Sequence, residues 1–253
     1  KAIKNSKIDI VVISTPTNTH YKIAKFALEN KKHIMCEKPL CLKTNEVKNL
    51  IILSKRNKKY LFVDYPFIYG ESVNYIKKII KEKKLGKPLI YESVREKAPY
   101  RKDANVIWDL GIHDFSILQH LTNLTPTNSK VNIFKSQKNF KSDFANINLF
   151  YKNNFSAFIK LNWTSPIKTR TIKIYFEKGL LVYNENEDIY KISLYQKTKK
   201  GYKHEFPLVY FNETLKIFVD FIASTINKNN FKDFDFNFSL KLTKSINKIT
   251  NNY

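Results

Sequence analysis

The sequence predicts an α/β protein, in which a partial, doubly wound parallel sheet is followed by an α+β domain with a large open antiparallel sheet. In the first third of the chain, short β-branched runs alternate with helical patterns, as in parallel strands joined by helices. From residue 131 onward apolar and polar residues alternate, which is typical of half-buried antiparallel strands. Because the pattern changes between residues 85 and 90, we predict a division into residues 1–86 and 87–253.

The first part reads as strand, helix, strand, helix, strand, and then a further helix. Such an order favours parallel pairing through right-handed crossovers. Thr17 or Asn18 can cap the first of these helices, and Thr44 can cap the second. The predicted strands cover 8–14, 32–36 and 60–65, and the predicted helices cover 20–30, a stretch from 44 and 71–84.

The second part combines one early strand, one early helix and a run of alternating strands. Its outward-facing positions still include aromatic residues, which indicates a homo-oligomer interface on that face of the sheet. These aromatic residues are Phe150, Phe158 and Tyr175. The predicted elements are a strand over 89–95, a helix over 109–121, strands around 131, 145–151, 155–163 and 172–176, and helices over 215–226 and 239–249.

The formal charge of +23 at pH 7 raises the question of nucleic-acid binding. Lysine is scattered along the whole chain and arginine is rare, so we expect no nucleic-acid partner. Membrane-length apolar stretches and a secretory leader are not found in the sequence, so we expect a cytoplasmic protein without a membrane partner. Cys36 and Cys41 lack partners at zinc spacing, which predicts free thiols and no metal site.

Unusual polar residues follow the predicted parallel strands. Ligands of such sheets lie beyond the carboxyl ends of the strands, so these residues would line one edge. Lys38, held by the proline after it, can polarise a hydroxyl or stabilise an alkoxide, although a strand running into a turn explains it equally well. The strand-end residues are Ser14, Thr15, Pro16, Glu37, Lys38, Pro39 and Tyr65.

Asp109 and His113 are four residues apart on a predicted helix and would share one face. A carboxylate beside an imidazole can fix its tautomer and let it pass a proton, and Gly111 between them permits close approach. A helix-start aspartate near a solvated histidine is the alternative reading. Together with Lys38, the pair suits removal of a proton from an alcohol, which is half of a hydride transfer to a nicotinamide ring.

Three stretches, in this order, resemble the Gfo/Idh/MocA family of NAD(P)-dependent oxidoreductases. They run from Ile8 to His20, from Cys36 to Leu40 and from Trp108 to Asp114. The resemblance extends over essentially the whole chain. It implies a partial Rossmann-like dinucleotide-binding domain over 1–86 and a substrate-binding and oligomerisation domain over 87–253.

The resemblance also implies roles for individual residues. Lys38, Asp109 and His113 would be catalytic, with Lys38 also contacting the substrate hydroxyl and the nicotinamide ribose. NAD or NADP is the implied cofactor, NAD being slightly favoured. The implied cofactor contacts are Ser14, Thr15, Pro16, Asn18, His20, Glu37 and Lys38. The implied substrate contacts, typical of the branch acting on sugars or nucleotide sugars, are Lys38, Tyr65, Arg95, Asn105, Trp108 and His113.

One departure from the family pattern is the missing glycine-rich phosphate cradle. The five glycines are Gly70, Gly86, Gly111, Gly179 and Gly201, and no Gly-x-Gly-x-x-Gly turn is present. The expected function is hydride transfer between nicotinamide and a secondary hydroxyl of a sugar or nucleotide sugar. The alternative is a fragment or truncated, non-catalytic paralogue that acts only in assembly.

Overall fold

The computed structural model describes residues 2–99, 104–136, 142–209, 213–231 and 234–250. The chain divides into two compact units. The first combines residues 1–66 with 213–253, and the second is formed by residues 67–212. These units do not coincide with the predicted division at residue 86, because the helix over residues 71–81 packs with the helix Ile112–Thr122 (α5) of the second unit.

The first unit contains a parallel three-stranded sheet in the order β1-β2-β3. Ile10–Ile13 (β1) pairs in register with His33–Glu37 (β2), and β2 pairs with Leu61–Asp64 (β3). The helices Thr17–Glu29 (α1) and Thr44–Asn57 (α2) form the two crossovers and contact each other. The predicted strand-helix alternation is therefore confirmed. A short 3₁₀ turn, Ala2–Lys4 (η1), precedes β1.

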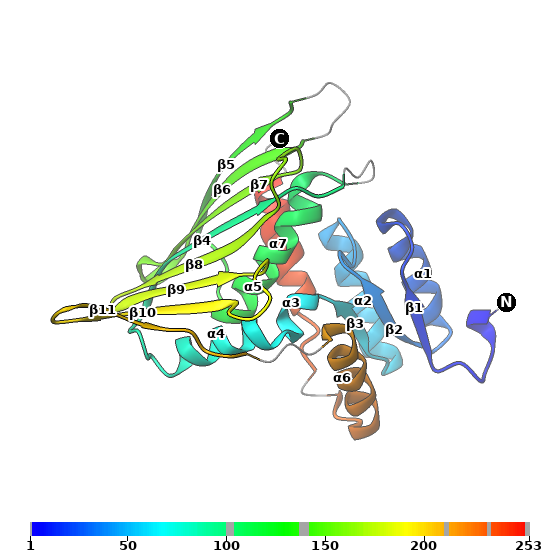
Figure 1. Ribbon diagram of the computed structural model, residues 1–253. Helices are drawn as coiled ribbons and strands as arrows, with labels where there is room; N and C mark the ends of the chain where they lie inside the picture. The colour runs from blue at the N-terminus through cyan, green and yellow to red at the C-terminus, as the bar shows by residue number, and fades with distance from the viewer. Residues whose placement is uncertain (1, 100–103, 137–141, 210–212, 232–233, 251–253) are drawn as a thin grey trace. The chain divides into compact units, whose positions relative to one another are not determined.

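Two helices from the end of the chain complete the first unit. They are Thr214–Lys228 (α6) and Phe238–Thr250 (α7), which Figure 1 draws in orange and red. The α7 helix packs on α2, where Asn247 Nδ2 donates to Thr44 Oγ1 at 3.0 Å. Phe62 of β3 is 2% exposed and meets the rings of Phe221 and Phe234 edge-on. An aromatic cluster thus joins the C-terminal segment to the parallel sheet.

The second unit is built on an eight-stranded sheet in the order β11-β10-β9-β8-β4-β7-β6-β5. Neighbouring strands pair antiparallel, except that β4 and β7 pair parallel, so the sheet is mixed rather than wholly antiparallel. This confirms the large, mostly antiparallel sheet. The strands are Pro88–Glu96 (β4), Asn128–Phe134 (β5), Phe144–Phe150 (β6), Ser156–Asn162 (β7), Thr169–Phe176 (β8), Gly179–Asn184 (β9), Ile192–Thr198 (β10) and Gly201–Glu205 (β11).

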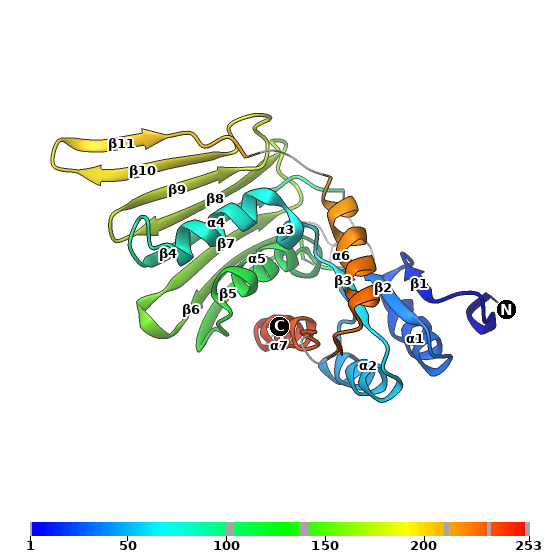
Figure 2. The same cartoon turned by 90° about the horizontal axis from the view of Figure 1, so that it is seen from below.

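Helices cover one face of this sheet, as Figure 2 shows for Glu71–Lys81 (α4) and Ile112–Thr122 (α5). Tyr91, Ile159 and Ile174 are among the side chains buried beneath them. The predicted helix over 109–121 differs at its start, because Ile107–Gly111 (η2) forms a π-helical turn that leads into α5. Such turns are rare and are often found at functional sites. The remaining short turns are Pro66–Tyr69 (α3) and Lys152–Asn154 (η3).

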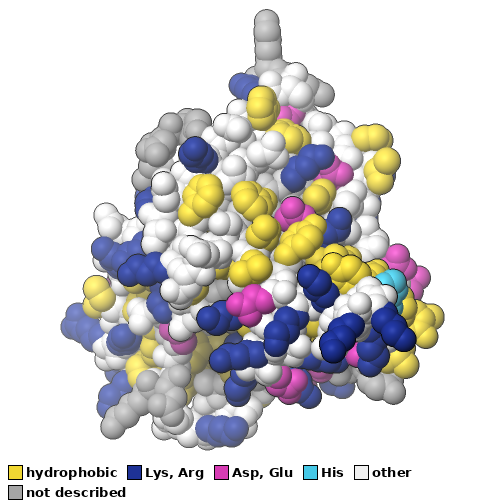
Figure 3. Space-filling model, turned by 90° about the vertical axis from the view of Figure 1, so that its left-hand side faces the viewer, with side chains coloured by type: hydrophobic (Ala, Val, Ile, Leu, Met, Phe, Trp, Pro, Cys, Tyr) yellow, Lys and Arg dark blue, Asp and Glu magenta, His cyan; other side chains and the backbone are white. Residues whose placement is uncertain are grey.

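On the other face of the sheet, the described residues of the second unit form no covering helix (Figure 2). Figure 3 shows hydrophobic side chains interspersed with lysine and acidic side chains on this side of the molecule. Phe158 is 36% exposed, and Tyr175 donates to Glu92 Oε2 at 3.0 Å. This mixed face is the one predicted to carry an oligomer interface, which stays a prediction. Among the described residues, no helix is long and apolar enough to cross a membrane.

Replacing Phe62 by alanine is expected to lower the free energy of unfolding by about 3–5 kcal/mol, because it removes a buried ring from the aromatic cluster. Urea unfolding measures this loss. Phe26→Ala is the matched control, since Phe26 lies on α1 and is 40% exposed, and its cost should stay within roughly 0.5 kcal/mol. Equal costs for both variants would contradict the packing described.

Candidate functional site

The turns after β1 and β2 present polar groups at one edge of the first unit's sheet. After β1, Ser14, Thr15 and Pro16 are exposed, and Thr15 and Thr19 share a hydrogen bond of 2.6 Å between their Oγ1 atoms. After β2, Glu37 is exposed and Lys38 is half-buried. The Lys38–Pro39 peptide bond is cis. The parallel register brings these predicted residues to the same end of the sheet.

His20, which the resemblance implies as a cofactor contact, is buried in the fold, and its cofactor role stays a prediction. It lies in the first turn of α1 with no exposed surface. Its Nδ1 is 2.9 Å from the carbonyl oxygen of Pro39, and its Nε2 is 2.8 Å from that of Thr15. Both ring nitrogens are therefore occupied by backbone atoms of the first unit.

Tyr65 also points into the first unit. Its side chain is 3% exposed, its hydroxyl donates to Ser239 Oγ at 3.1 Å, and its ring packs on Phe238. Tyr65 thus attaches α7 to the end of β3, and its predicted substrate contact stays a prediction.

Two carboxyl groups adjoin Lys38 at the sheet edge. Asp64 is directly opposite Glu37 in the pairing of β2 and β3, and Asp64 is only 9% exposed. Burial, together with the nearby Glu37 carboxylate, raises the pKa of Asp64 to about 6. The edge therefore combines an ammonium group with a carboxyl group that changes charge in mildly acidic solution.

In the second unit, the π-helical turn and the start of α5 hold the two predicted acid/base residues. Asp109 is 8% exposed, and the indole Nε1 of Trp163 donates to its Oδ2 at 2.9 Å. His113 is half-buried, and the ring of Phe67 meets it edge-on with 5.0 Å between centroids. A Cβ added at Gly111 would lie 2.9 Å from Leu161 Cδ1, so the end of that buried leucine side chain on β7 would have to shift.

Asn105 and Trp108 stabilise the start of this turn. The Asn105 side-chain oxygen accepts the backbone N–H of Trp108 at 2.9 Å, and the Trp108 side chain is 7% exposed. Both were predicted to contact the substrate, and this role stays a prediction.

Arg95 lies inside the second unit and is only 3% exposed. Its guanidinium donates to Asp114 at 2.8 Å and to Glu185 at 3.1 Å, and it lies 4.5 Å from the ring centroid of Phe67. Burial alone would lower the pKa of Arg95, but the two carboxylates raise it, so the guanidinium stays charged. Arg95 is therefore held by partners within the second unit, and its predicted substrate contact stays a prediction.

The sequence reasoning missed Phe67 and Trp163, which contact His113 and Asp109. Both are aromatic residues in apolar runs, where a core position is the usual interpretation. Phe67 follows β3 and Trp163 follows β7, so each lies at a strand end. The strand-end position is therefore the sequence feature that could have identified these two residues.

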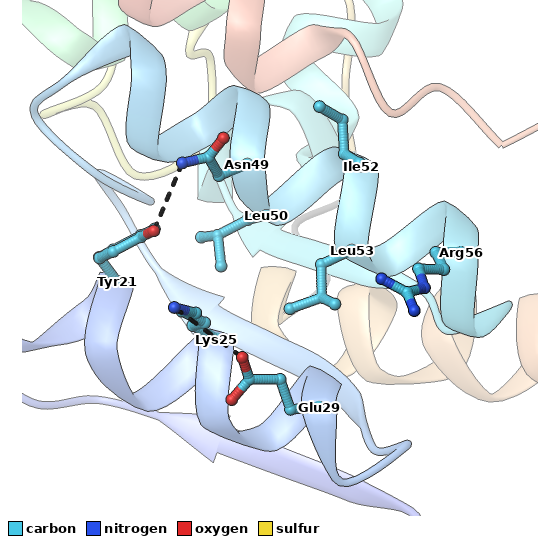
Figure 4. Close-up of a pocket in the computed structure, with 8 residues that line it drawn as sticks. All are labelled: Tyr21, Lys25, Glu29, Asn49, Leu50, Ile52, Leu53 and Arg56. Atoms are coloured by element: carbon cyan, nitrogen blue, oxygen red, sulfur yellow. Dashed lines mark hydrogen bonds and ion pairs between the residues drawn. The ribbon is translucent and has the colours of Figure 1, made fainter.

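A pocket of about 280 Å³ lies elsewhere in the first unit, in the groove between α1 and α2. In Figure 4, Asn49 Nδ2 reaches Tyr21 Oη at 3.5 Å across it, and Lys25 pairs with Glu29. No predicted site residue lines this pocket. It is therefore separate from the candidate site. The lining residues are Tyr21, Lys25, Glu29, Asn49, Leu50, Ile52, Leu53 and Arg56.

The two units correspond to two family models. Residues 1–65 match the oxidoreductase family model with an NAD-binding Rossmann fold, and residues 73–182 match the GFO/IDH/MocA C-terminal domain. The chain belongs to the GFO/IDH/MocA oxidoreductase family. This confirms the resemblance found in the three sequence stretches and the fold class.

Curated relatives include sugar and nucleotide-sugar dehydrogenases. Myo-inositol 2-dehydrogenase of Thermotoga maritima is 27% identical over 125 residues, covering 47% of this chain and 37% of the relative. UDP-N-acetylglucosamine 3-dehydrogenase of Acidithiobacillus ferrooxidans is 31% identical over 124 residues, covering 48% and 38%. The alignments thus span under two-fifths of these relatives' length.

Solved structures share the fold over nearly the whole chain. The Acidithiobacillus ferrooxidans UDP-N-acetylglucosamine 3-dehydrogenase has a TM-score of 0.85 at 20% identity, covering 96% of this chain and 78% of that one. A 3-ketoreductase of Actinomadura kijaniata, in complex with TDP-benzene and NADP, has a TM-score of 0.84 at 12% identity, covering 98% and 78%. At these identities the likeness establishes the fold alone.

The residues of the first unit fit a dinucleotide in part. Exposed hydroxyl and amide groups of Ser14, Thr15 and Asn18, beside half-buried Lys38, suit a ribose and its neighbouring groups. All five glycines of the chain lie between residues 70 and 201, so residues 1–66 contain no glycine-rich phosphate cradle. The fit therefore concerns the nicotinamide side of the cofactor and does not extend to the diphosphate.

The raised pKa of Asp64 predicts a pH-dependent stability. Because the folded-state pKa, about 6, lies above the ordinary value of 3.8, the folded chain binds this proton more tightly. The free energy of unfolding should therefore fall as pH rises from about 4 to about 6, and Asp64→Asn should remove that part of the slope. Urea unfolding across this range measures it.

Glu29→Gln provides the control for this slope, since Glu29 is half-exposed and forms only a surface pair with Lys25 at 3.9 Å. Its pH dependence should run parallel to that of the unmodified chain. If Asp64→Asn left the pH dependence of the free energy of unfolding unchanged, the raised pKa assigned to Asp64 would be refuted.

Proposed function

We propose that this protein transfers a hydride between a nicotinamide cofactor and a secondary hydroxyl of a sugar or nucleotide sugar. The observation that supports it most is the arrangement of the second unit's acid/base residues. Asp109 is held by an indole N–H, while half-buried His113 is packed against an aromatic ring. A positioned imidazole near a buried carboxylate suits proton exchange with an alcohol.

In this proposal His113 accepts the hydroxyl proton of the substrate as the carbon–hydrogen bond breaks, and Asp109 stabilises the imidazolium that forms. Lys38 contributes a positive charge at the oxygen as it becomes a carbonyl, and it also contacts the nicotinamide ribose. In the reverse direction His113 returns the proton. The bound cofactor supplies the hydride acceptor or donor.

NAD is proposed as the cofactor in preference to NADP, and the sugar is proposed to be a polyol or nucleotide sugar, as in the names of the relatives. Ser14, Thr15, Asn18 and Glu37 are the cofactor contacts whose exposure suits that role. The mixed outer face of the large sheet is proposed to carry a homo-oligomer contact. A cytoplasmic location stays a prediction.

A non-catalytic role in assembly is the second candidate. It is favoured by the mixed outer face of the large sheet, where Phe158 is 36% exposed and could contribute to a protein contact. Titration of the chain with NAD and NADH separates the two candidates. Binding in the micromolar range would favour the oxidoreductase and contradict the assembly role.

The catalytic assignment is tested by the reduction of NAD or NADP in the presence of myo-inositol or UDP-N-acetylglucosamine. Lys38→Met and His113→Asn should each lower kcat/KM by about 10²–10⁴-fold, because each removes a charge or proton carrier at the reacting oxygen. Absorbance of the reduced nicotinamide measures the rate.

Two variants that carry the same residue changes, lysine to methionine and histidine to asparagine, at other positions serve as controls. Lys48→Met removes an exposed lysine from α2, and His120→Asn removes the other histidine of α5, which bonds Asn74. Both should retain turnover within about three-fold, as surface changes usually do. Turnover of the Lys38 and His113 variants at the level of these controls would sink the assignment.

A further inference from the structure

We infer that His20 is a positioning residue, which fixes the turn carrying Lys38 to the turn between β1 and α1. The inference rests on the proposed function for the importance of Lys38. Three observations carry it: His20 has no exposed surface, its Nδ1 lies 2.9 Å from the Pro39 oxygen, and its Nε2 lies 2.8 Å from the Thr15 oxygen. The side chain therefore bridges the two turns from inside the unit.

The chemistry of these contacts requires the ring as a donor. Backbone carbonyl oxygens only accept hydrogen bonds, so each contact needs a proton on the ring nitrogen that faces it. A neutral imidazole satisfies one of the two carbonyls, and an imidazolium satisfies both. The two nitrogen atoms of a histidine ring can face two different carbonyl groups, which few other side chains can do. This gives a specific reason for a histidine at this position.

The bridge acts on the residue next to Lys38. The segment around Lys38 is otherwise anchored by buried side chains on both sides, since Cys36 is 0% and Leu40 is 1% exposed. Lys38 itself is half-buried. The Pro39 carbonyl is where the backbone of this turn is tied to α1, so the His20 contact restrains the direction in which the Lys38 side chain leaves the turn.

The turn that contains Thr15, at the other end of the His20 bridge, is held by its own hydrogen bonds. Thr19 Oγ1 donates to the Pro16 oxygen at 2.7 Å and is 2.6 Å from Thr15 Oγ1. The turn from 15 to 19 is therefore a small, hydrogen-bonded unit at the start of α1. Through His20 it becomes a support for residues 38 and 39, nineteen residues further along.

His33 offers a matched comparison in the same sheet. It is 8% exposed, its Nδ1 accepts the Tyr60 backbone N–H at 3.0 Å, and its ring stacks on that of Tyr60. Burial, with a contribution from Lys59, lowers the pKa of His33 to about 4. His33 begins β2, whereas Lys38 follows its end, so a substitution at His33 perturbs the fold without touching the Lys38 turn.

The test measures the reactivity of Lys38 in the whole chain, without cofactor or substrate. His20→Leu and His33→Leu are reductively methylated, and mass spectrometry follows the rate at Lys38 relative to exposed Lys43. His20→Leu should raise the relative rate at least about five-fold, because the carbonyl groups of Thr15 and Pro39 lose their ring partner and the turn opens locally. His33→Leu should leave it within about two-fold.

His20→Gln extends the test, because its amide can donate to one of the two carbonyls. An intermediate rate in this variant supports positioning through the hydrogen bonds, and it also covers the case in which His20→Leu does not fold. A rate in both His20 variants equal to that of the unmodified chain would overturn the inference. So would an equal increase in His33→Leu, since that would indicate general loosening.

This readout is independent of turnover. If Lys38→Met retained full activity, the proposed function would fail while the labelling result stood. If labelling were unchanged while Lys38→Met lost activity, only the positioning role of His20 would fail.

Discussion

The parallel register of β1, β2 and β3 is the constraint on which the candidate site depends. Because Ile13 pairs with Cys36 and Cys36 with Val63, the three strands end together, and the turns that follow them share one edge. Burying a charged side chain in the interior costs free energy. This register instead brings three charged residues to the sheet edge, where Glu37 pairs with Asp64 and Lys38 follows Glu37. The His20 bridge then joins two of these turns from the inside.

The second unit depends on a different interaction, a buried ion pair. Desolvating Arg95 and Asp114 costs free energy that their attraction repays only with good geometry and further hydrogen bonds. Tyr91 donates to the second oxygen of Asp114 at 2.9 Å. Glu185 accepts a hydrogen bond from Arg95 and is the fourth member of the network. Asp114 directly follows His113, and Arg95 lies against Phe67, so the network fixes both the backbone and the ring beside the proposed base.

The elements that sequence reasoning predicted are those encoded locally. The signals are the β-branched runs, the helix periodicity and the strand-end position of Lys38. Each of them can be recognised from residues that lie only a few positions apart in the sequence. The burial of Tyr65 and Arg95 could not be predicted in this way, because their partners, Ser239 and Glu185, are 174 and 90 residues away. His20 and Arg95 are polar by type, so a pattern assigns them to a ligand until the acceptors within the fold are known. The π-helical turn likewise follows from packing on β7 and has no sequence period of its own.

The proposal that Lys38 and His113 serve the same hydride transfer is tested most directly by a double-mutant cycle on kcat/KM. Lys38→Met, His113→Asn and the double variant are compared in hydride transfer to the preferred dinucleotide. If both side chains stabilise the same transition state, the double variant should lose little more than the more damaging single change, by roughly ten-fold at most. Losses that simply multiply would show that the two residues act independently and would contradict their proposed joint role in the transfer.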